Sequence, residues 1–354
     1  MKWEELESRV RQVARLLWSK EAEKTSIAGI DLDCVVKLSP ARWAILEVSV
    51  DRTLDKVRND IARLNLARQA LFQENIFAEC YFIGDRPPTT AMVQAGKPFH
   101  INVLSVGSLE RSFFDYSSYV SARNNLQFGS AVNPITGERD DSEYVPVAYR
   151  KGESLGVLDL QSIAEFLKLG KKVVLLGEYG TGKSRCLREL FNILSADHPK
   201  TNQYFISIDL RSTWGLRSGP EIIRRHFDDI GLAEKSDRII RAYHQGAGSL
   251  LLDGFDEVGS QSWSDNPIKC QNIRYESLSG VRDLVEKCKG GCIVGGREHY
   301  FNSHEELFRA LGLREREVEA IRCHEEFGDK ELEIFLQRFV EFVVLPEWLP
   351  RRPL

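Results

Sequence analysis

The sequence carries, at residues 173–184, the run Val173-Val174-Leu175-Leu176-Gly177-Glu178-Tyr179-Gly180-Thr181-Gly182-Lys183-Ser184. An apolar segment of strand length breaks at Gly177, and the following residues satisfy the pattern G-x-x-x-x-G-K-[ST]. Glycines in such a loop let backbone N–H groups converge on an anion without interference from Cβ atoms. The amphipathic segment from Lys183 to about Leu194 predicts a helix whose positive end points at the same place. The run therefore predicts a phosphate-binding loop between a strand and a helix.

The residues of this loop have distinct expected roles. Lys183 is expected to reach the β- and γ-phosphates of a nucleotide, and Ser184 to bind Mg²⁺ through its hydroxyl. The expected cofactors are therefore ATP or GTP together with Mg²⁺. The predicted nucleotide-binding residues are Gly177, Glu178, Tyr179, Gly180, Thr181, Gly182, Lys183, Ser184 and Arg185.

A second run, Ser249-Leu250-Leu251-Leu252-Asp253-Gly254-Phe255-Asp256-Glu257, supplies the acidic partners. Its apolar part is typical of a buried parallel strand, and the first carboxylate falls at the carboxyl end, where open α/β sheets bind ligands. On a strand that neighbours the phosphate-loop strand, Asp253 would bind Mg²⁺ or its water shell. Asp256 and Glu257 follow, near the expected γ-phosphate, and Glu257 is expected to polarise the attacking water.

Together these motifs resemble those of a known family. The phosphate loop, residues 253–257 and a later apolar strand ending in Gly295-Gly296-Arg297 resemble the NACHT branch of the signal-transducing STAND NTPases, which includes animal innate-immunity receptors and bacterial antiviral proteins. The resemblance covers roughly residue 159 to the C-terminus. It implies ATP binding and hydrolysis, and assembly into a homo-oligomer on activation. It also implies Arg297 as a sensor of the γ-phosphate, although the family more often has Thr-Ser-Arg-Pro where this chain has Gly-Gly-Arg-Glu.

The amino-terminal part reads as a helix, a hairpin, a second helix and a strand. Apolar residues recur at helical spacing over residues 2–19 and 54–72, whereas residues 27–36, 43–49 and 78–83 have the composition of strands. In the period-two geometry of a strand, Asp31 and Asp33 share one face, as do Glu47 and Ser49. The predicted hairpin therefore carries acids on both of its strands.

This order of elements resembles the restriction-endonuclease-like PD-(D/E)xK fold, of the Mrr-like sort that is often fused to bacterial defence NTPases. The resemblance implies Asp33 and Glu47 as Mg²⁺ ligands of a nuclease that acts on duplex DNA, together with a lysine that activates water. The family's lysine position is occupied by Ser49, so the candidate lysine is Lys56 on the following helix, with Lys37 as a second. The alternative is a degenerate domain that dimerises or docks and cleaves nothing.

The expected fold class is α/β, with a parallel three-layer P-loop NTPase sheet preceded by a smaller restriction-endonuclease-like domain. The predicted boundaries are 1–111 for the first domain, 112–158 for an aromatic-rich linker and 159–354 for the NTPase domain. Helices expected near 160–169, 220–230, 235–245 and 277–287, with a strand at 204–210, complete the alternation. We interpret one basic group as surface or interface charges: Arg211, Arg217, Arg224 and Arg225.

Composition limits the possible protein classes. The 354 residues are 42% hydrophobic and 28% charged, which is typical of a globular protein. A net charge of −4 gives no overall basic signature, so any contact with DNA requires a local patch. Seven cysteines, an odd number, favour reduced thiols. Because the sequence shows no apolar signal-peptide core and no run of membrane-spanning length, we expect a cytoplasmic protein with no membrane partner.

The end of the chain suggests that residues are missing. After Glu331 an apolar stripe predicts one more amphipathic helix, and the sequence stops at Leu349-Pro350-Arg351-Arg352-Pro353-Leu354. Because Arg352-Pro353-Leu354 resembles the start of the proline motif of STAND proteins, we expect a fragment that lacks the helical, winged-helix and sensor parts of that group.

Two functional hypotheses follow from these patterns. The first is a nucleotide switch in bacterial antiviral defence, answering an unknown trigger, in which ATP with Mg²⁺ gates oligomerisation and an amino-terminal DNA nuclease. The second is a nucleotide-controlled scaffold whose amino-terminal domain is catalytically dead and serves for interaction.

Overall fold

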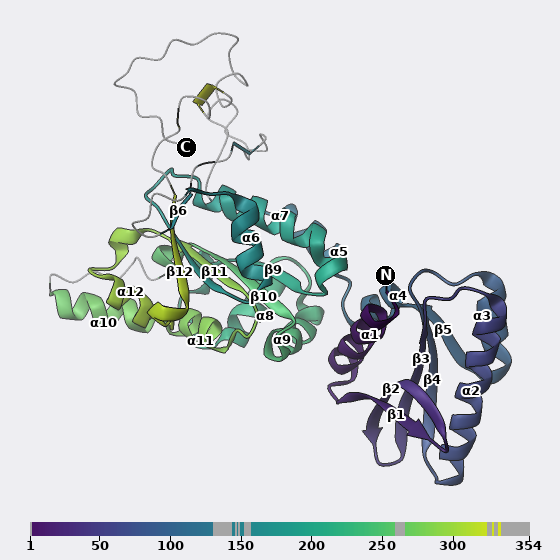
Figure 1. The fold of residues 1–354 in the computed structure, drawn as a ribbon. Helices are drawn as coiled ribbons and strands as arrows, with labels where there is room; N and C mark the ends of the chain where they lie inside the picture. Colours follow the sequence, from purple (N-terminus) through teal and green to yellow (C-terminus); the bar gives the residue numbers. More distant parts are fainter. Residues whose placement is uncertain are drawn as a thin grey trace. The chain divides into compact units, whose positions relative to one another are not determined.

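The structure, a computed structural model, describes residues 2–129, 144, 145, 147, 149–151, 157–258, 266–323, 328, 332 and 333. The predicted helix after Glu331 falls almost entirely outside these residues. The chain divides into two compact units, Met1–Ser117 and Ser118–Leu354 (Figure 1). Each unit combines helices with its own sheet, which confirms the α/β class in its coarse form.

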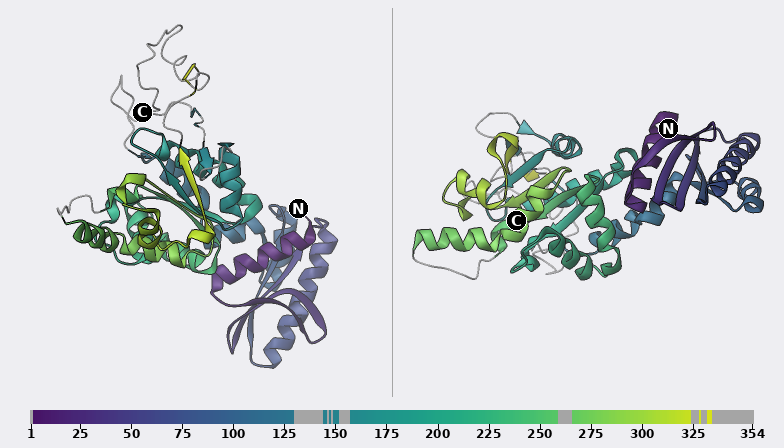
Figure 2. Two further views of the ribbon diagram at one scale, coloured as in Figure 1. Left: turned by 60° about the vertical axis from the view of Figure 1, so that its left-hand side comes forward. Right: turned by 90° about the horizontal axis from the view of Figure 1, so that it is seen from below.

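The first unit is a five-stranded sheet with helices on both faces (Figure 2). Strand β3 pairs antiparallel with β2 and parallel with β4, and β4 pairs parallel with β5. Alternation along the strands directs Val35 and Ile45 toward α2, and Cys34 and Leu46 toward α1. The elements of this unit are α1 (Trp3–Trp18), β1 (Ala22–Ile27), β2 (Ile30–Ser39), β3 (Arg42–Ser49), α2 (Leu54–Gln73), β4 (Phe77–Gly84), α3 (Thr90–Gly96), β5 (Ile101–Ser105) and α4 (Val106–Phe113).

The prediction of one continuous strand over residues 27–36 was wrong. Ile27 pairs with Ile30, so the chain reverses at Ala28 and Gly29, which have φ values of 50° and 78°. A two-residue hairpin of this kind needs positive φ at both central residues, and glycine adopts it readily. The alternation of apolar residues continues through the turn, which is why the pattern concealed it.

The second unit contains a seven-stranded sheet in the order β7-β6-β12-β8-β11-β10-β9. The five strands from β12 to β9 are parallel, whereas β6 and β7 pair antiparallel at one edge. The strands are β6 (Tyr149–Lys151), β7 (Val157–Leu158), β8 (Lys172–Leu176), β9 (Tyr204–Asp209), β10 (Gly248–Asp253), β11 (Cys292–Gly296) and β12 (Val318–Cys323). The α-helices that the structure describes here are α5 (Tyr116–Asn124), α6 (Leu160–Lys168), α7 (Lys183–Thr201), α8 (Gly219–Asp229), α9 (Ser236–Gln245), α10 (Pro267–Ser277), α11 (Ser279–Lys287) and α12 (His304–Ala310).

The strand order corrects one expectation about the acidic strand. Asp253 was expected on a direct neighbour of the phosphate-loop strand, but β11 lies between β10 and β8. The order of strands in a parallel sheet depends on where each crossover returns, and the sequence does not fix this. Several elements of this unit were not anticipated: α5, β6, β7 and α12, together with α10, which starts at Pro267 after the capping residue Asn266, and β12, which pairs with β8.

The range 112–158 contributes structure to the second unit. Helix α5 and strands β6 and β7 come from it, and its aromatic residues Tyr119, Phe128 and Tyr149 are buried. Residues 130–143 of this range lie outside the described residues. Among the helices that the structure describes, none has both the length and the apolar character needed to cross a membrane.

Candidate functional site

The predicted phosphate loop joins β8 to α7. Gly180 and Gly182 have φ values of 79° and 80°, a region that glycine adopts at little cost. A Cβ atom on Gly177 would lie 2.5 Å from Oγ1 of the buried Thr181, so this position also requires glycine. Thr181 donates to the carbonyl of Glu178 through both its backbone N (3.3 Å) and its hydroxyl (2.9 Å). The loop is therefore a tight turn held by its own backbone, immediately before the first turn of α7.

Lys183 is the first residue of α7, and its side chain folds back over the loop. Its Nζ donates to the carbonyls of Gly177 and Glu178, both at 2.8 Å. Burial lowers the pKa of Lys183, and the charges of Asp253 and Asp256 oppose that shift. The ammonium thus lies among the acids that sequence reasoning assigned to the same site.

Ser184 and Asp253 meet although an entire strand separates β8 from β10. Burial raises the pKa of Asp253 to about 6, and a hydrogen bond from the Ser184 side chain opposes the shift. The register explains how Asp253 reaches across: its partner on β11 is Gly295, where an added Cβ atom would lie 3.7 Å from Asp253 Oδ1 and 3.1 Å from Leu187 Cδ1. The glycine leaves the end of β11 open to the carboxylate. A hydroxyl and a carboxylate are oxygen ligands of the kind that Mg²⁺ takes together with phosphates and waters, so these residues fit the ion.

Asp256 orients the predicted sensor Arg297. The arginine Nε lies 2.9 Å from Asp256 Oδ2, and its backbone N donates to Oδ1 at 3.2 Å. Its guanidinium also lies 5.6 Å from the ring centre of Tyr179, which is exposed at the mouth of the loop. The structure therefore brings Arg297 to the phosphate loop, with Asp256 as the group that positions it.

Glu257 is paired with an arginine that sequence reasoning had placed elsewhere. Arg211 Nε lies 3.5 Å from Glu257 Oε2 and donates to Asp209 Oδ1 at 3.0 Å. Burial raises the pKa of Glu257, the charges of Asp256 and Asp209 add to that shift, and Arg211 opposes it. Arg211 is exposed, as a surface charge would be, but its role beside Glu257 and that of Asp209 were missed. Their position at the carboxyl end of β9, level with Asp253, is the signal that could have found them.

Two further ion-pair contacts involve residues of the loop and of the segment after β11. Glu178 Oε2 lies 2.8 Å from His299 Nδ1, and Glu298 Oε1 lies 2.5 Å from Arg322. Arg185, also predicted to bind the nucleotide, is half-buried in the first turn of α7. All seven cysteines are free thiols and are buried, so none forms a disulfide.

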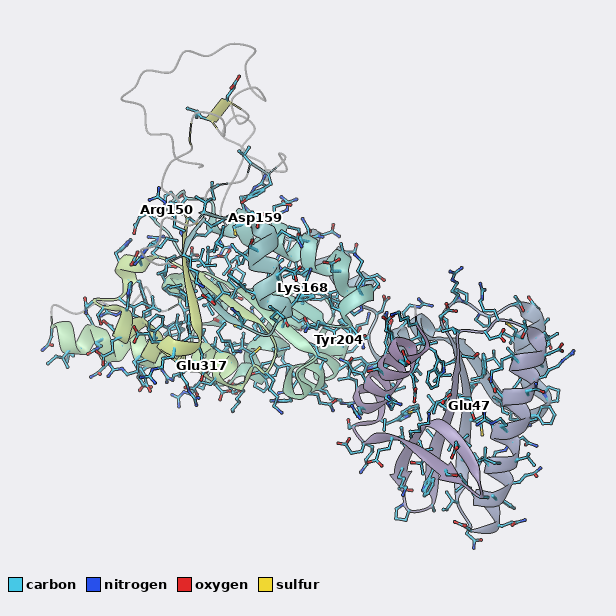
Figure 3. All side chains as sticks on the ribbon, in the orientation of Figure 1. Glu47, Arg150, Asp159, Lys168, Tyr204 and Glu317 are labelled. Atoms are coloured by element: carbon cyan, nitrogen blue, oxygen red, sulfur yellow. The ribbon has the colours of Figure 1, made fainter. Side chains whose placement is uncertain are left out.

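The second candidate site lies in the first unit, on the face of the sheet that α2 covers. Strands β2 and β3 pair only as far as Cys34 and Leu46, and beyond that point Asp33 Oδ2 accepts a hydrogen bond from Val48 N at 2.9 Å. Glu47, which lies in the first unit (Figure 3), is only 2% exposed, and its side chain interacts with that of Asp33. Burial and the charge of Asp33 raise the pKa of Glu47 to about 9. The structure thus brings the two predicted carboxylates together and favours a proton on Glu47 near neutral pH.

The cation beside Glu47 is an arginine. Arg63 Nη2 lies 3.3 Å from Glu47 Oε1, whereas the predicted lysine, Lys56, donates from Nζ to Asp60 Oδ1 at 2.7 Å. Asp60 is 1% exposed and its charge also raises the pKa of Glu47. Residues 56, 60 and 63 share one face of α2 by helical spacing, which is the signal that would have added Asp60 and Arg63 to the site.

The two positions from which the family's lysine was expected have other partners. Ser49 is buried, and its hydroxyl bonds to the backbone N (3.1 Å) and the carbonyl (3.3 Å) of Asp51. Lys37 Nζ lies 4.8 Å from the ring centre of Trp43. Within the described residues no group of three His, Cys, Asp or Glu side chains is arranged to hold a metal ion. Asp33 and Glu47 still offer the two carboxylates that a Mg²⁺ ion with several waters accepts, and Oε1 of Glu47 has no hydrogen-bond partner.

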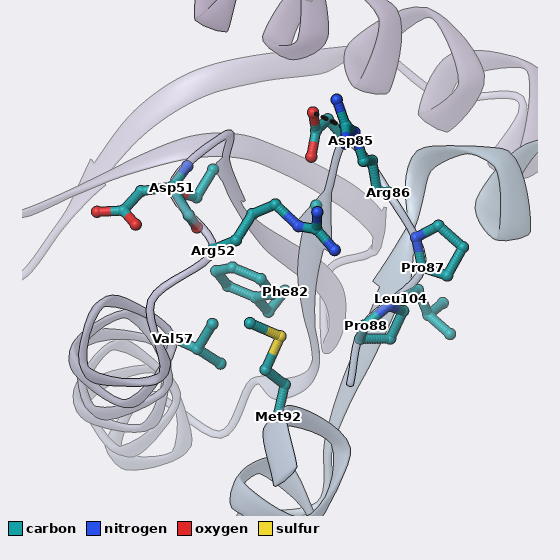
Figure 4. Close-up of a pocket in the computed structure, with 12 residues that line it drawn as sticks. Asp51, Arg52, Val57, Phe82, Asp85, Arg86, Pro87, Pro88, Met92 and Leu104 are labelled. Atoms are coloured by element: carbon teal, nitrogen blue, oxygen red, sulfur yellow. Dashed lines mark hydrogen bonds and ion pairs between the residues drawn. The ribbon is translucent and has the colours of Figure 1, made fainter. Parts of the chain in front are cut away.

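A small pocket opens beside Ser49, at the carboxyl ends of β3, β4 and β5 (Figure 4). Its volume is about 20 Å³, enough for a water molecule and too small for a nucleotide. Phe82 and Met92 supply its apolar wall, and Asp51, Arg52 and Asp85 its polar side. The pocket therefore adds no organic ligand site next to the carboxylates.

No protein-family model matches this chain, and no curated protein is significantly similar to it. Its function is therefore inferred from its residues and their geometry.

Proposed function

We propose that this chain is a nucleotide switch of the NACHT-type STAND group, which binds and hydrolyses ATP, or GTP, with Mg²⁺. The observation that carries the proposal is the meeting of the Ser184 hydroxyl and the Asp253 carboxylate beside Lys183, at the end of the predicted phosphate loop. The two residues come from separate motifs, and each motif alone predicted the same Mg²⁺ site. The order of the five parallel strands supports the proposal, because it places Arg297 between the loop and the acidic strand.

The residues of the second unit divide the chemistry among them. Bound Mg²⁺ would neutralise charge that develops on the transferred phosphoryl group. Ser184 and Asp253 would hold the ion, and Lys183 would move from the loop carbonyls onto the phosphates. Glu257 would orient the attacking water and accept its proton, for which a raised pKa is favourable. Arg297, held by Asp256, would direct its positive charge at the γ-phosphate.

In this proposal nucleotide binding gates assembly into a homo-oligomer, which activates the first unit as a Mg²⁺-dependent nuclease on duplex DNA. Asp33 and Glu47 would bind the ion, and the resemblance implies bacterial antiviral defence as the setting. The meeting of the two carboxylates supports this function, since two acids that share a site are suited to a divalent cation. Among the described residues, Arg63 is the one cation that forms an ion pair with Glu47.

A second candidate function is a nucleotide-controlled scaffold in which the first unit binds a partner or a second copy. One specific observation favours it: the lysine that would activate water is bonded to Asp60, and Arg63 occupies the position beside Glu47. A buried acid that is paired with arginine and carries a proton can be a structural group with no catalytic role.

The test uses the purified full chain with ATP, GTP or neither, in the presence of Mg²⁺. Hydrolysis of nucleotide, and cleavage of duplex DNA that depends on nucleotide, are the expected results for the switch with a nuclease. Glu47→Ala should abolish cleavage and leave nucleotide binding intact. Nucleotide hydrolysis without cleavage by the wild type favours the scaffold, and cleavage that Glu47→Ala does not reduce contradicts the nuclease site.

A further inference from the structure

The chain segment that follows α5 runs directly past the candidate metal ligand Ser184. Gly129 has a φ of 68°, and a Cβ atom added to it would lie 2.6 Å from both Cβ and Oγ of Ser184. Because side-chain carbons do not approach other atoms so closely, only the bare backbone of a glycine fits beside this hydroxyl. Gly129 therefore lies directly beside the predicted phosphate loop, next to the hydroxyl that is the candidate Mg²⁺ ligand.

Arg211 connects the same glycine to the acids of the site. Its Nη2 donates to the carbonyl of Gly129 at 3.2 Å, while its Nε donates to Asp209 and lies 3.5 Å from Glu257. A guanidinium is planar and presents its donors in a fixed fork, so a shift at one contact disturbs the others. One side chain thus links the backbone at Gly129, the end of β9 and the carboxylate that we assign to water activation.

Helix α5 anchors this segment along the edge of the sheet. Ser207 lies on β9, the last strand in the sheet order, and its N–H donates to the Tyr119 hydroxyl at 3.0 Å. Its carbonyl accepts from Arg123 Nε at 2.9 Å. Edge strands expose such backbone groups, and here two residues four apart on one helix face satisfy both of them. The helix is therefore fixed to the strand that ends at Asp209.

Phe128 completes the connection from α5 to the loop. It is 4% exposed, its ring centre lies 6.1 Å from that of Phe191 on α7, and the Arg123 guanidinium lies 3.6 Å from it. Residues 119–129, which we name the α5 strap, thus make a continuous series of contacts from the edge strand to Ser184. Helix α5 starts at Tyr116, and its first two residues belong to the first unit, which ends at Ser117.

We propose that the α5 strap and Arg211 couple the metal–nucleotide site to the start of α5, so that binding at Ser184 and the placement of the strap determine each other. The inference rests on the function proposed for the second unit, and it assigns Gly129 and Arg211 as positioning residues of that site. This coupling is reciprocal. If the strap strengthens ligand binding by a given free energy, the bound ligand stabilises the strap by the same amount.

The first experiment measures the affinity of the full chain for a non-hydrolysable ATP analogue, with Mg²⁺ and with EDTA. Gly129→Ala should weaken the Mg²⁺-dependent affinity by about 10- to 100-fold, as is usual when the support of a metal ligand is displaced. Affinity in EDTA should stay at the wild-type value. Gly231→Ala is the matched control: Gly231 also has positive φ (74°), but an added Cβ atom would meet nothing within 4 Å.

The second experiment avoids any folding defect that Gly129→Ala introduces. Amide hydrogen exchange of residues 118–129 is compared with and without the Mg²⁺-bound analogue, in the wild type, Arg211→Gln and Arg225→Gln. Arg225 forms an exposed ion pair with Asp229 and serves as the control. The analogue should slow exchange in the wild type and in Arg225→Gln, and should leave it unchanged in Arg211→Gln.

The outcomes separate the two proposals. A wild type that binds no nucleotide under any condition overturns the proposed function, and the inference falls with it. A wild type that binds, with Gly129→Ala binding equally well and strap exchange indifferent to the analogue, overturns the inference alone. A selective loss of the Mg²⁺-dependent affinity in Gly129→Ala, or of the exchange response in Arg211→Gln, supports it.

Discussion

The two units bury carboxylates at strand ends in different electrostatic settings. In the first unit, Glu47 lies against another acid, and burial with the charge of Asp33 raises its pKa to about 9. In the second, Asp253 lies against a hydroxyl and near the ammonium of Lys183, and its pKa rises only to about 6. Burial is the first cause in both cases, so the neighbouring groups decide which acid is ionised near neutral pH.

The difference between the two pKa values affects how each site can bind a cation. Asp253 is largely ionised at pH 7 and can bind Mg²⁺ as it stands. Glu47 must first release a proton, and an ion that binds there must also compete with Arg63. If both units bind Mg²⁺ as proposed, the ion meets an ionised carboxylate in the second unit, whereas in the first it must displace the proton of Glu47 and the charge of Arg63.

The largest expected effect concerns the cation of the second unit. Lys183→Ala should reduce nucleotide affinity by about 100- to 1,000-fold, because a partly buried charged donor to the phosphates is removed. Isothermal titration calorimetry of the full chain measures it. Lys200→Ala, at the exposed far end of the same helix, should bind as the wild type does. Equal affinities for the two variants would contradict the assignment of the loop.

The next effect concerns Glu47 and has a defined sign. The folded-state pKa of Glu47, about 9, lies above the ordinary value of 4.5. The protonated Glu47 side chain therefore makes its full contribution to the free energy of unfolding below about pH 4.5, and this contribution is lost as pH rises toward 9. Glu47→Gln cannot ionise, so from pH 6 to pH 9 its free energy of unfolding should rise relative to that of the wild type by about 4 kcal/mol. Urea unfolding in EDTA at both pH values measures this. The exposed Glu74→Gln should change nothing, and a Glu47→Gln variant with the wild-type pH dependence would refute the buried protonated acid.

The pH dependence of the metal site should run in the opposite direction. Since the pKa of Asp253 is about 6, Mg²⁺-dependent nucleotide affinity should fall as pH drops through that value. Asp253→Asn should weaken the affinity at pH 8 by about tenfold and remove the pH dependence near 6. Fluorescence titrations from pH 5 to pH 8 provide the measurement, with the exposed Asp237→Asn as control. A variant that keeps the wild-type profile would show that another group titrates.

The smallest expected effect distinguishes two adjacent glycines on β11. A Cβ atom on Gly296 would lie 2.4 Å from the Phe255 ring, so Gly296→Ala should cost about 1–2 kcal/mol of stability through overpacking. Gly295→Ala, with its nearest contact at 3.1 Å, should cost less and mainly disturb Asp253. Thermal unfolding and Mg²⁺ titration of both variants test the pair. The reverse order of stability would mean that the open end of β11 has another cause.

Sequence patterns predicted the structural features that depend on residues close together in the chain. The glycine-rich turn after β8, the start of α7 and the acidic end of β10 could be predicted because each is a contiguous pattern with a local cause: glycine geometry, helix periodicity or an apolar run. The pairing of Asp33 with Glu47 was also predictable in outline, because both positions lie on one face of a short hairpin. Even here the turn at Ala28 and Gly29 was missed, since alternation continued through it.

Contacts between distant segments could not be predicted in the same way. The end of β9 and the spacing along α2 mark Arg211 and Arg63 as candidates, but they do not decide which acid each one meets. Those pairs, and the approach of Gly129 to Ser184, depend on where a helix or a crossover returns. The sequence by itself determined which residues have the chemistry to bind a phosphate or a metal ion. Only the tertiary structure decided which cation meets which acid, because burial and charge act through space on groups that the chain order keeps far apart.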